Sequence, residues 1–377
     1  MKYLIIAVLF TWFPDSRGEP VKNFAGRWET TYGLMELQQK GSVISGSYLM
    51  NGEKCAIDGR LENGKFTFKY KEPKASGQGW FELGSGSEKF IGTWKQDGTN
   101  TWAPWVGVRI PDYASLAAGV WATPYGRLRI IEKSKDVRIG VFANGGAATL
   151  TNVALLNDGL EISGDWKGQE LRKFTGTRLK PIPGKVWLMV MEAHWESSLE
   201  DREYAFGDML KAFFDRTPNV EVRRRPFSDS RSLKRWLDEL AFIPEPIVVT
   251  IASHGQSDGL WVDGANIPAS VVTEGLKYAA SLKALHFSSC LVMKGKFGQD
   301  IFKQLSKDGN KVAVSGYKNS VDWAASALFE MNYFDLILSR GLAPPEASQA
   351  ALVMFPIAGD RPLKNVPVAP GGFSVIF

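Results

Sequence analysis

The first half of the chain alternates hydrophobic and polar residues with a period of two. Clear examples are SVISGSYLM at 42–50, KFTFKY at 65–70 and GWFELG at 79–84, with Gly, Asn, Asp and Lys turns between such segments. Because successive side chains of a strand point to opposite faces, this pattern predicts short antiparallel strands that are buried on one side. We therefore expect all-β units, either small barrels or meanders.

An internal repeat divides this β-rich half into two copies. Residues 26–37 read GRWETTYGLMEL and residues 119–130 read GVWATPYGRLRI, so both contain the pattern GxWxTxYG. FIGTW at 90–94 is echoed by FTGTR at 174–178. Such a repeat indicates two related structural units. The stretch GRWETTYGLMELQQKGSVISGSY resembles the lipocalin-like or avidin-like β modules of bacterial multidomain proteins, a resemblance that identifies no ligand.

Tryptophans are frequent in the two β units. They could line the mouth of a ligand-binding barrel, or they could fill a barrel interior, where a large ring removes much apolar area from water. Because most of them begin or end predicted strands, we favour the packed interior. The residues concerned are Trp28, Trp80, Trp94, Trp102, Trp105, Trp121 and Trp166.

The pattern changes after the segment RLKPIPGK at 178–185, whose prolines and glycine are typical of a linker. Continuous apolar runs then alternate with helical stripes, one of which is predicted from Phe206, Met209, Leu210, Phe213 and Phe214. The runs KVWLMVME, VEVRRRPF, EPIVVTIASHG, LKALHFSSC and KVAVSGY predict strands, and GGFSVIF at the end predicts an edge strand. Alternation of this kind predicts a doubly wound, mainly parallel sheet.

The expected organisation is therefore multidomain, as a chain of 377 residues also suggests. We place a signal peptide at 1–18, the two β units at 19–112 and 113–180, and the α/β domain at 181–377. The apolar run at 3–13 would extend about 16 Å as a helix, which is too short to cross a bilayer. It favours a secreted or periplasmic protein without a stable membrane span. An uncleaved anchor or a cytoplasmic protein are the alternatives.

The charge of the chain argues against nucleic-acid binding. The net charge of +5 is small, and the basic cluster at 223–225 lies apart from any stripe of basic and aromatic residues, so we expect no nucleic-acid binding.

The chain has two cysteines, Cys55 and Cys290. This number excludes a disulfide framework and a cysteine-based zinc site, although one disulfide between them is possible. Cys55 is interpreted as a buried apolar residue. No residue spacing indicates a metal site, and no cofactor is expected.

Candidate chemistry lies at the ends of two predicted strands. His254 and Cys290 each close an apolar run. Neighbouring parallel strands are about 4.8 Å apart and end at the same edge of a sheet, so we expect the imidazole and the thiol to meet there. An imidazole can take the thiol proton and later protonate a leaving amine. Gly255 lacks a side chain, so its amide and that of Cys290 are candidates for stabilising an oxyanion.

Each of these residues also has a structural interpretation. A histidine at a strand end is commonly a surface or capping residue, and a lone buried cysteine is usually inert. For two further histidines we expect structural roles away from this edge: His286 lies inside the second run, and His194 follows the first strand of the domain.

The segment 184–340 resembles the caspase-like fold of clan CD cysteine peptidases, and within it the CHAT group. The motifs are VVTIASHG followed by DGLWVDG, then LKALHFSSCLVMKG, and VAVSGYKNSVDWAASALFE, which looks like the strand and helix beside the specificity pocket. The resemblance implies Cys290 as the nucleophile and His254 as general base and acid. The family also has inactive members.

Asp322 follows the last of these strands. Some relatives place a carboxylate there at the floor of a substrate pocket, where it would select Arg or Lys. An aspartate before WAASALFE is also well suited to cap the next helix, and this is the interpretation we favour.

The leading hypothesis is an exported cysteine endopeptidase that acts on a polypeptide substrate, with the β units recruiting a protein partner or target. The alternative is a binding or signalling protein in which the caspase-like domain is a silent scaffold. A thiol hydrolase or transferase on the same two residues is a third possibility.

Overall fold

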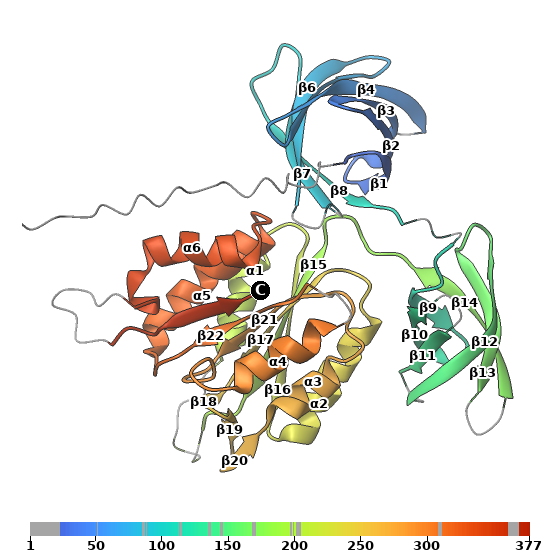
Figure 1. Ribbon diagram of the computed structural model, residues 1–377. Helices are drawn as coiled ribbons and strands as arrows, with labels where there is room; N and C mark the ends of the chain where they lie inside the picture. Colours follow the sequence, from blue (N-terminus) through green and yellow to red (C-terminus); the bar gives the residue numbers. More distant parts are fainter. Residues whose placement is uncertain are drawn as a thin grey trace, which may run out of the picture.

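Two closed antiparallel barrels precede a six-stranded mixed sheet with helices on both faces (Figure 1). This computed structural model describes residues 23–377 with these exceptions: 51, 85–86, 88, 112, 114, 135–136, 144–145, 168–170, 197, 199, 201–204, 308–310 and 361–368. The fold class predicted from the sequence is confirmed, whereas the proposed signal peptide at 1–18 lies outside the described residues.

The first barrel closes when its first strand pairs with both its second and its last strand. Its period-two pattern is the one seen in the sequence: in KFTFKY both phenylalanines and the tyrosine are buried and the residues between them face outward. The eight strands are β1 (Gly26–Thr30), β2 (Gly33–Lys40), β3 (Val43–Met50), β4 (Glu53–Glu62), β5 (Lys65–Lys71), β6 (Ser76–Leu83), β7 (Lys89–Gln96) and β8 (Ala103–Arg109).

The second barrel has six strands and closes in the same way, through β9 with β10 and β14. The strands are β9 (Gly119–Thr123), β10 (Gly126–Ser134), β11 (Val137–Phe142), β12 (Gly146–Leu156), β13 (Glu161–Lys167) and β14 (Leu171–Leu179).

The repeated tryptophan contacts an arginine of the closing strand in each barrel. Trp28 pairs across the closing strands with Arg109, and Trp121 pairs with Arg178. Each guanidinium lies over the indole ring, at 4.2 Å and 4.1 Å from its centroid respectively. Each indole N–H donates to the carbonyl oxygen of the residue four positions before it. The repeat therefore encodes the seam at which the first and last strands of a barrel meet.

The glycines and the threonine of the GxWxTxYG pattern also have the same structural role in both barrels. A Cβ on Gly26 or Gly119 would lie under 3.0 Å from the arginine of the seam, and both glycines have positive φ. The hydroxyls of Thr30 and Thr123 each donate to the carbonyl oxygen of the repeat's second glycine, and each accepts from the amide of the repeat's tyrosine. These contacts fix the tight turn between the first two strands of each unit.

The second sequence echo does not join equivalent strands. FIGTW lies in β7, whereas FTGTR lies in β14. Because β14 closes its barrel on β9 and carries the seam arginine, its structural counterpart is β8 rather than β7. The second unit reaches its closing strand sooner because it has two strands fewer.

Aromatic side chains fill the first barrel. Trp28 and Trp105 are buried, as is Trp121 in the second barrel, so the packed-interior interpretation is confirmed for these three. Trp102 is exposed instead, and Trp80, Trp94 and Trp166 are half-buried. The rings that pack together in the first barrel include Phe24, Trp28, Tyr48, Phe66, Phe68, Phe81, Phe90 and Trp105.

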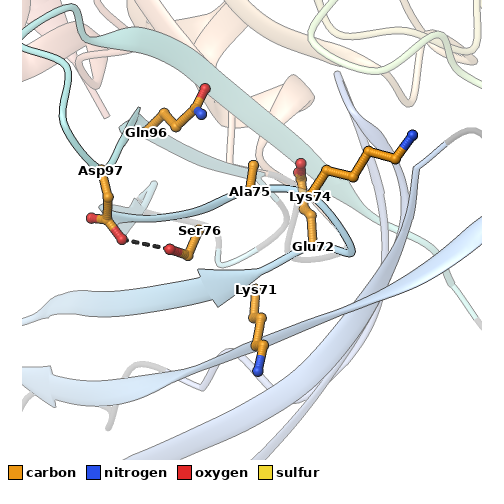
Figure 2. A pocket seen from close by; sticks show the side chains of 7 residues that line it. All are labelled: Lys71, Glu72, Lys74, Ala75, Ser76, Gln96 and Asp97. Carbon is orange, nitrogen blue, oxygen red and sulfur yellow. Dashed lines mark hydrogen bonds between the residues drawn. The ribbon is translucent and has the colours of Figure 1, made fainter.

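A hollow of about 390 Å³ lies at the rim of this barrel rather than inside it (Figure 2). It sits between the β5–β6 and β7–β8 turns, where Ser76 Oγ donates to Asp97 Oδ2 at 2.7 Å. Its lining residues are Lys71, Glu72, Lys74, Ala75, Ser76, Gln96 and Asp97.

The C-terminal sheet has the strand order β16-β15-β17-β21-β22-β23. All neighbouring pairs are parallel except the last, in which β23 runs antiparallel to β22. The predicted position of β23 at the edge of the sheet is confirmed. Every residue of the central strand β17 is buried. The strands are β15 (Val186–Ala193), β16 (Val220–Phe227), β17 (Ile247–Ala252), β21 (Leu282–Ser288), β22 (Ala313–Tyr317) and β23 (Phe373–Ile376).

Helices cover both faces of this sheet (Figure 1). One face is covered by α1 (Phe206–Phe214), α5 (Trp323–Leu338) and α6 (Pro344–Met354), and the other by α2 (Ser230–Glu239), α3 (Ala269–Gly275) and α4 (Phe297–Leu305). Shorter elements are the 3-10 turns η1 (Leu240–Phe242) and η3 (Pro356–Ala358), and the strands β18 (His254–Gln256), β19 (Gly259–Val262) and β20 (Ala265–Ile267).

The predicted stripe on α1 is partly wrong. Phe206, Leu210 and Phe214 are buried, but Met209 and Phe213 are 37% and 47% exposed. Residues four apart lie one above another on a helix, so this short helix buries a narrower row than the predicted one. In the described part of the chain, we find no helix with the length and apolar character needed to cross a membrane.

The second barrel packs on the α/β domain just before β17. Val120 and Val141 of the barrel form one apolar cluster with Ala241 and Phe242 of η1. Arg127 Nη1 also donates to the Phe242 carbonyl oxygen at 3.4 Å. The barrel is thus attached to the segment that leads into the strand before His254.

Candidate active site

Strands β17 and β21 are neighbours, and their parallel ladder pairs Ala252 with Ser288 as its last residues. His254 and Cys290 each lie two residues beyond this pair. Both segments therefore leave the sheet at its carboxyl edge and in the same register, although the two residues are far apart in sequence.

Gly255 packs directly on the loop that carries Cys290. A Cβ added to this glycine would lie 2.9 Å from Ser289 Cβ and from Val292 Cγ1, and closer still to the Cys290 carbonyl oxygen. Ser253 directly precedes His254 and Ser289 directly precedes Cys290, and the buried hydroxyls of these two serines are 3.4 Å apart. The absence of a side chain at Gly255 is thus what lets the His254 segment lie against the Cys290 loop.

The Cys290 thiol is half-buried, and its Sγ accepts a hydrogen bond from the Val321 amide at 3.4 Å. The next residue, Leu291, has a φ of 64°. A branched apolar side chain in this left-handed region is strained and persists only where surrounding contacts enforce it. Here the Leu291 amide donates to the Asn319 carbonyl oxygen at 3.2 Å, and the Met293 amide donates to that of Tyr317 at 3.0 Å.

His254 is exposed at the start of β18 and makes an edge-to-face contact with Trp195 at 4.9 Å between ring centroids. Trp195 follows β15, which is the parallel neighbour of β17. The same segment contains His194, whose Nδ1 is 3.7 Å from Glu196 Oε2. The prediction that His194 lies away from this edge is wrong, because β15 also ends there.

A buried polar cluster between β21, β22 and α5 lies next to the start of the Cys290 loop, and it was not predicted from the sequence. Glu330 of α5 is 0% exposed, and its Oε1 accepts hydrogen bonds from Ser288 Oγ at 2.9 Å and from Tyr317 Oη at 3.0 Å. His286 Nε2 is 3.3 Å from the same oxygen, and its Nδ1 is 3.0 Å from Ser315 Oγ. His286 is thus a buried hydrogen-bonding residue, as predicted.

Burial and the nearby carboxylate also act on the tyrosine of this cluster. The pKa of Tyr317 is raised well above its usual value, mainly by desolvation and secondly by the charge of Glu330. The phenol therefore stays protonated and remains a donor to Glu330 throughout the physiological range.

Asp322 is the N-cap of α5. Its Oδ1 accepts from the Ala325 amide at 2.9 Å, and its backbone is extended as an N-cap requires. It also lines a slot of about 10 Å³, whose other walls include Tyr317, Val321 and Ser326. Val321 connects this slot with the thiol, because its backbone amide contacts the Cys290 sulfur.

The two cysteines differ sharply in their surroundings. Both are free thiols, so the disulfide alternative is not realised. Cys55 is buried in the first barrel, where desolvation raises its pKa. This burial agrees with the apolar role predicted for it.

Comparison with known proteins adds no identification. No protein-family model matches the chain, and none of the curated proteins is significantly similar to it. Within the described ranges, no group of three or more His, Cys, Asp or Glu side chains is arranged to hold a metal ion.

Proposed function

We propose that this protein is a cysteine endopeptidase whose nucleophile is Cys290 and whose general base and acid is His254. The observation that carries the proposal is the common register of the two residues beyond β17 and β21, together with the contact of Gly255 on the Cys290 loop. The mostly parallel sheet with helices on both faces agrees with the resemblance to caspase-like peptidases of the CHAT group.

In this mechanism the imidazole takes the thiol proton, and the thiolate attacks the carbonyl carbon of a peptide bond. The backbone amides of Gly255 and Cys290 stabilise the oxyanion that forms. The carbon–nitrogen bond then breaks, and the imidazolium gives its proton to the leaving amine. Water, deprotonated by the same imidazole, hydrolyses the thioester and restores the thiol.

The slot lined by Val321 and Asp322 is our candidate for the pocket that binds the side chain preceding the scissile bond. Asp322 uses one carboxylate oxygen to cap α5 and has a second oxygen for a basic group, which supports cleavage after Arg or Lys. The slot has to widen to admit such a side chain, because its present volume fits little more than one water molecule.

The barrels would recruit the polypeptide substrate or a protein partner. Their exposed surfaces support this role better than their interiors do, because aromatic rings fill the first barrel. An N-terminal signal peptide would direct the protein to a secreted or periplasmic location.

The test is the rate at which iodoacetamide or a peptidyl-arginine electrophile alkylates each cysteine, resolved by mass spectrometry. We expect fast, pH-dependent labelling of Cys290 that is lost in His254→Ala, with the buried Cys55 as a slow reference in the same molecule. Slow labelling that is equal at both thiols and indifferent to His254→Ala would contradict the proposal. It would support the alternative function, a catalytically silent scaffold.

A further inference from the structure

The Cys290 loop depends on a second loop for its shape. The segment 289–293 is joined to the segment 317–321 by the Val321 amide on the Cys290 sulfur and by two backbone hydrogen bonds, Leu291 to Asn319 and Met293 to Tyr317. The second loop follows β22, the parallel neighbour of β21. The position of the thiol is therefore set by how the ends of these two strands lie relative to each other.

Glu330 of α5 makes hydrogen bonds to the ends of both strands. One of its oxygens accepts from Ser288, the last residue of β21, and from Tyr317, the last residue of β22. Ser288 lies two residues before Cys290, which belongs to the loop that follows β21. A single carboxylate oxygen thus connects the base of the nucleophile loop with the base of the loop that contacts its sulfur.

The carboxylate of Glu330 differs in kind from the side chains around it on α5. The neighbours of Glu330 on α5 that face the sheet are apolar or aromatic, including Phe329, Tyr333 and Phe334. An apolar residue could fill the same space without burying a carboxylate, but it would leave the Ser288 and Tyr317 hydroxyls without their acceptor. An acceptor at position 330 provides the hydrogen bond that both strand ends share, and the same oxygen also lies 3.3 Å from His286 Nε2.

We propose that Glu330 is a positioning residue for Cys290, which holds the two strand ends in the arrangement that places the thiol; its catalytic consequence rests on the proposed peptidase function. Glutamine has an oxygen at the same position and can accept both hydroxyls, whereas alanine cannot. The proposal therefore predicts that Glu330→Gln retains the geometry and Glu330→Ala loses it.

The experiment combines two measurements on the full chain. Hydrogen–deuterium exchange reports the order of 289–293 and 317–321, and alkylation by iodoacetamide reports the reactivity of Cys290. The variants are Glu330→Ala, Glu330→Gln, and the single-arm changes Ser288→Ala and Tyr317→Phe. The last two keep the proposal testable if Glu330→Ala does not fold.

Glu245 provides a matched control. It is also a buried glutamate that accepts from two donors, the Ile182 amide and the Trp187 indole, but it lies before β17 at the opposite edge of the sheet. Glu245→Ala should therefore lower the stability of the domain without changing exchange in the two loops or alkylation of Cys290.

We expect Glu330→Ala to raise exchange in both loops and to slow alkylation of Cys290 by about ten-fold or more, since small displacements of reacting groups have large kinetic effects. Each single-arm variant should show part of the effect, and Glu330→Gln should restore both readouts to within about two-fold. Unchanged exchange in Glu330→Ala, or equal losses in the Ala and Gln variants, would overturn the proposal. If Cys290 proves unreactive in the unmodified protein, the peptidase function fails and the exchange data alone decide the role of Glu330.

Discussion

Gly255→Ala is the sharpest test of the site geometry. The added methyl group would lie 2.9 Å from both Ser289 Cβ and Val292 Cγ1, whereas ordinary contact begins near 3.4 Å. It would be closer still to the Cys290 carbonyl oxygen, which belongs to the backbone and has little freedom to retreat. We therefore expect the His254 segment and the Cys290 loop to separate by about 1 Å, a displacement that can cost about a hundred-fold in rate.

The assay is alkylation of Cys290 at neutral pH, with His254→Ala setting the rate expected without an imidazole. Overpacking should also lower the free energy of unfolding by about 1–3 kcal/mol. Gly264→Ala controls for this loss. Gly264 lies in the turn between β19 and β20 with a φ of 76°, but nothing lies within 4 Å of a Cβ there. Its backbone strain costs about 1–2 kcal/mol without pushing on Cys290.

The expected outcome is that both glycine variants lose stability but only Gly255→Ala loses most of its His254-dependent labelling. If Gly255→Ala labels at the unmodified rate while it is folded, the contact does not position the two side chains. The argument for a His254–Cys290 pair would then lose its structural basis.

Three further predictions follow from other contacts. Arg178→Met removes the cation over Trp121 and three hydrogen bonds to carbonyl oxygens, so we expect a loss of about 2–4 kcal/mol in denaturant unfolding followed by tryptophan fluorescence. Asp322→Ala should cost about 1 kcal/mol in thermal unfolding through the lost cap, and an active enzyme should also lose its preference for arginine; unchanged selectivity would contradict the pocket role. Burial raises the pKa of Tyr48 well above its usual value and that of Tyr70 to about 12. Their contribution to stability is therefore complete below about pH 10 and is lost as the pH rises toward the folded-state values, so alkaline titration of phenol absorbance should show a late phase that coincides with unfolding.

Periodicity carried most of the fold prediction. Period-two segments such as 65–70 are barrel strands in the structure, and the apolar runs that lead to His254 and Cys290 are neighbouring parallel strands. Closure was not predictable in the same way, because the number of strands in a barrel depends on pairing registers between distant segments. The seam arginines illustrate this: Arg109 lies outside both sequence echoes, yet it is the structural equivalent of Arg178.

The candidate site was predictable only where chemically capable side chains coincide with a strand end. His254 and Cys290 are found by this rule, whereas Glu330 lies inside a helix and acts through Ser288 and Tyr317, two residues that carry no signal of their own. One sign was present in the sequence. The helix WAASALFEMNYFDLIL is apolar on most sides, which indicates burial, so a glutamate within it needs buried partners.

Three features that oppose stability converge on the Cys290 loop. Leu291 adopts a left-handed backbone conformation, Gly255 leaves no room for a side chain against the loop, and Glu330 buries a carboxylate beneath it. A loop with only a connecting role between β21 and α4 would have no need of any of them. Natural sequences generally agree with local rules, and departures from those rules concentrate where function requires a fixed geometry. Their coincidence around one half-buried thiol is the physical reason to seek the activity of this protein at Cys290.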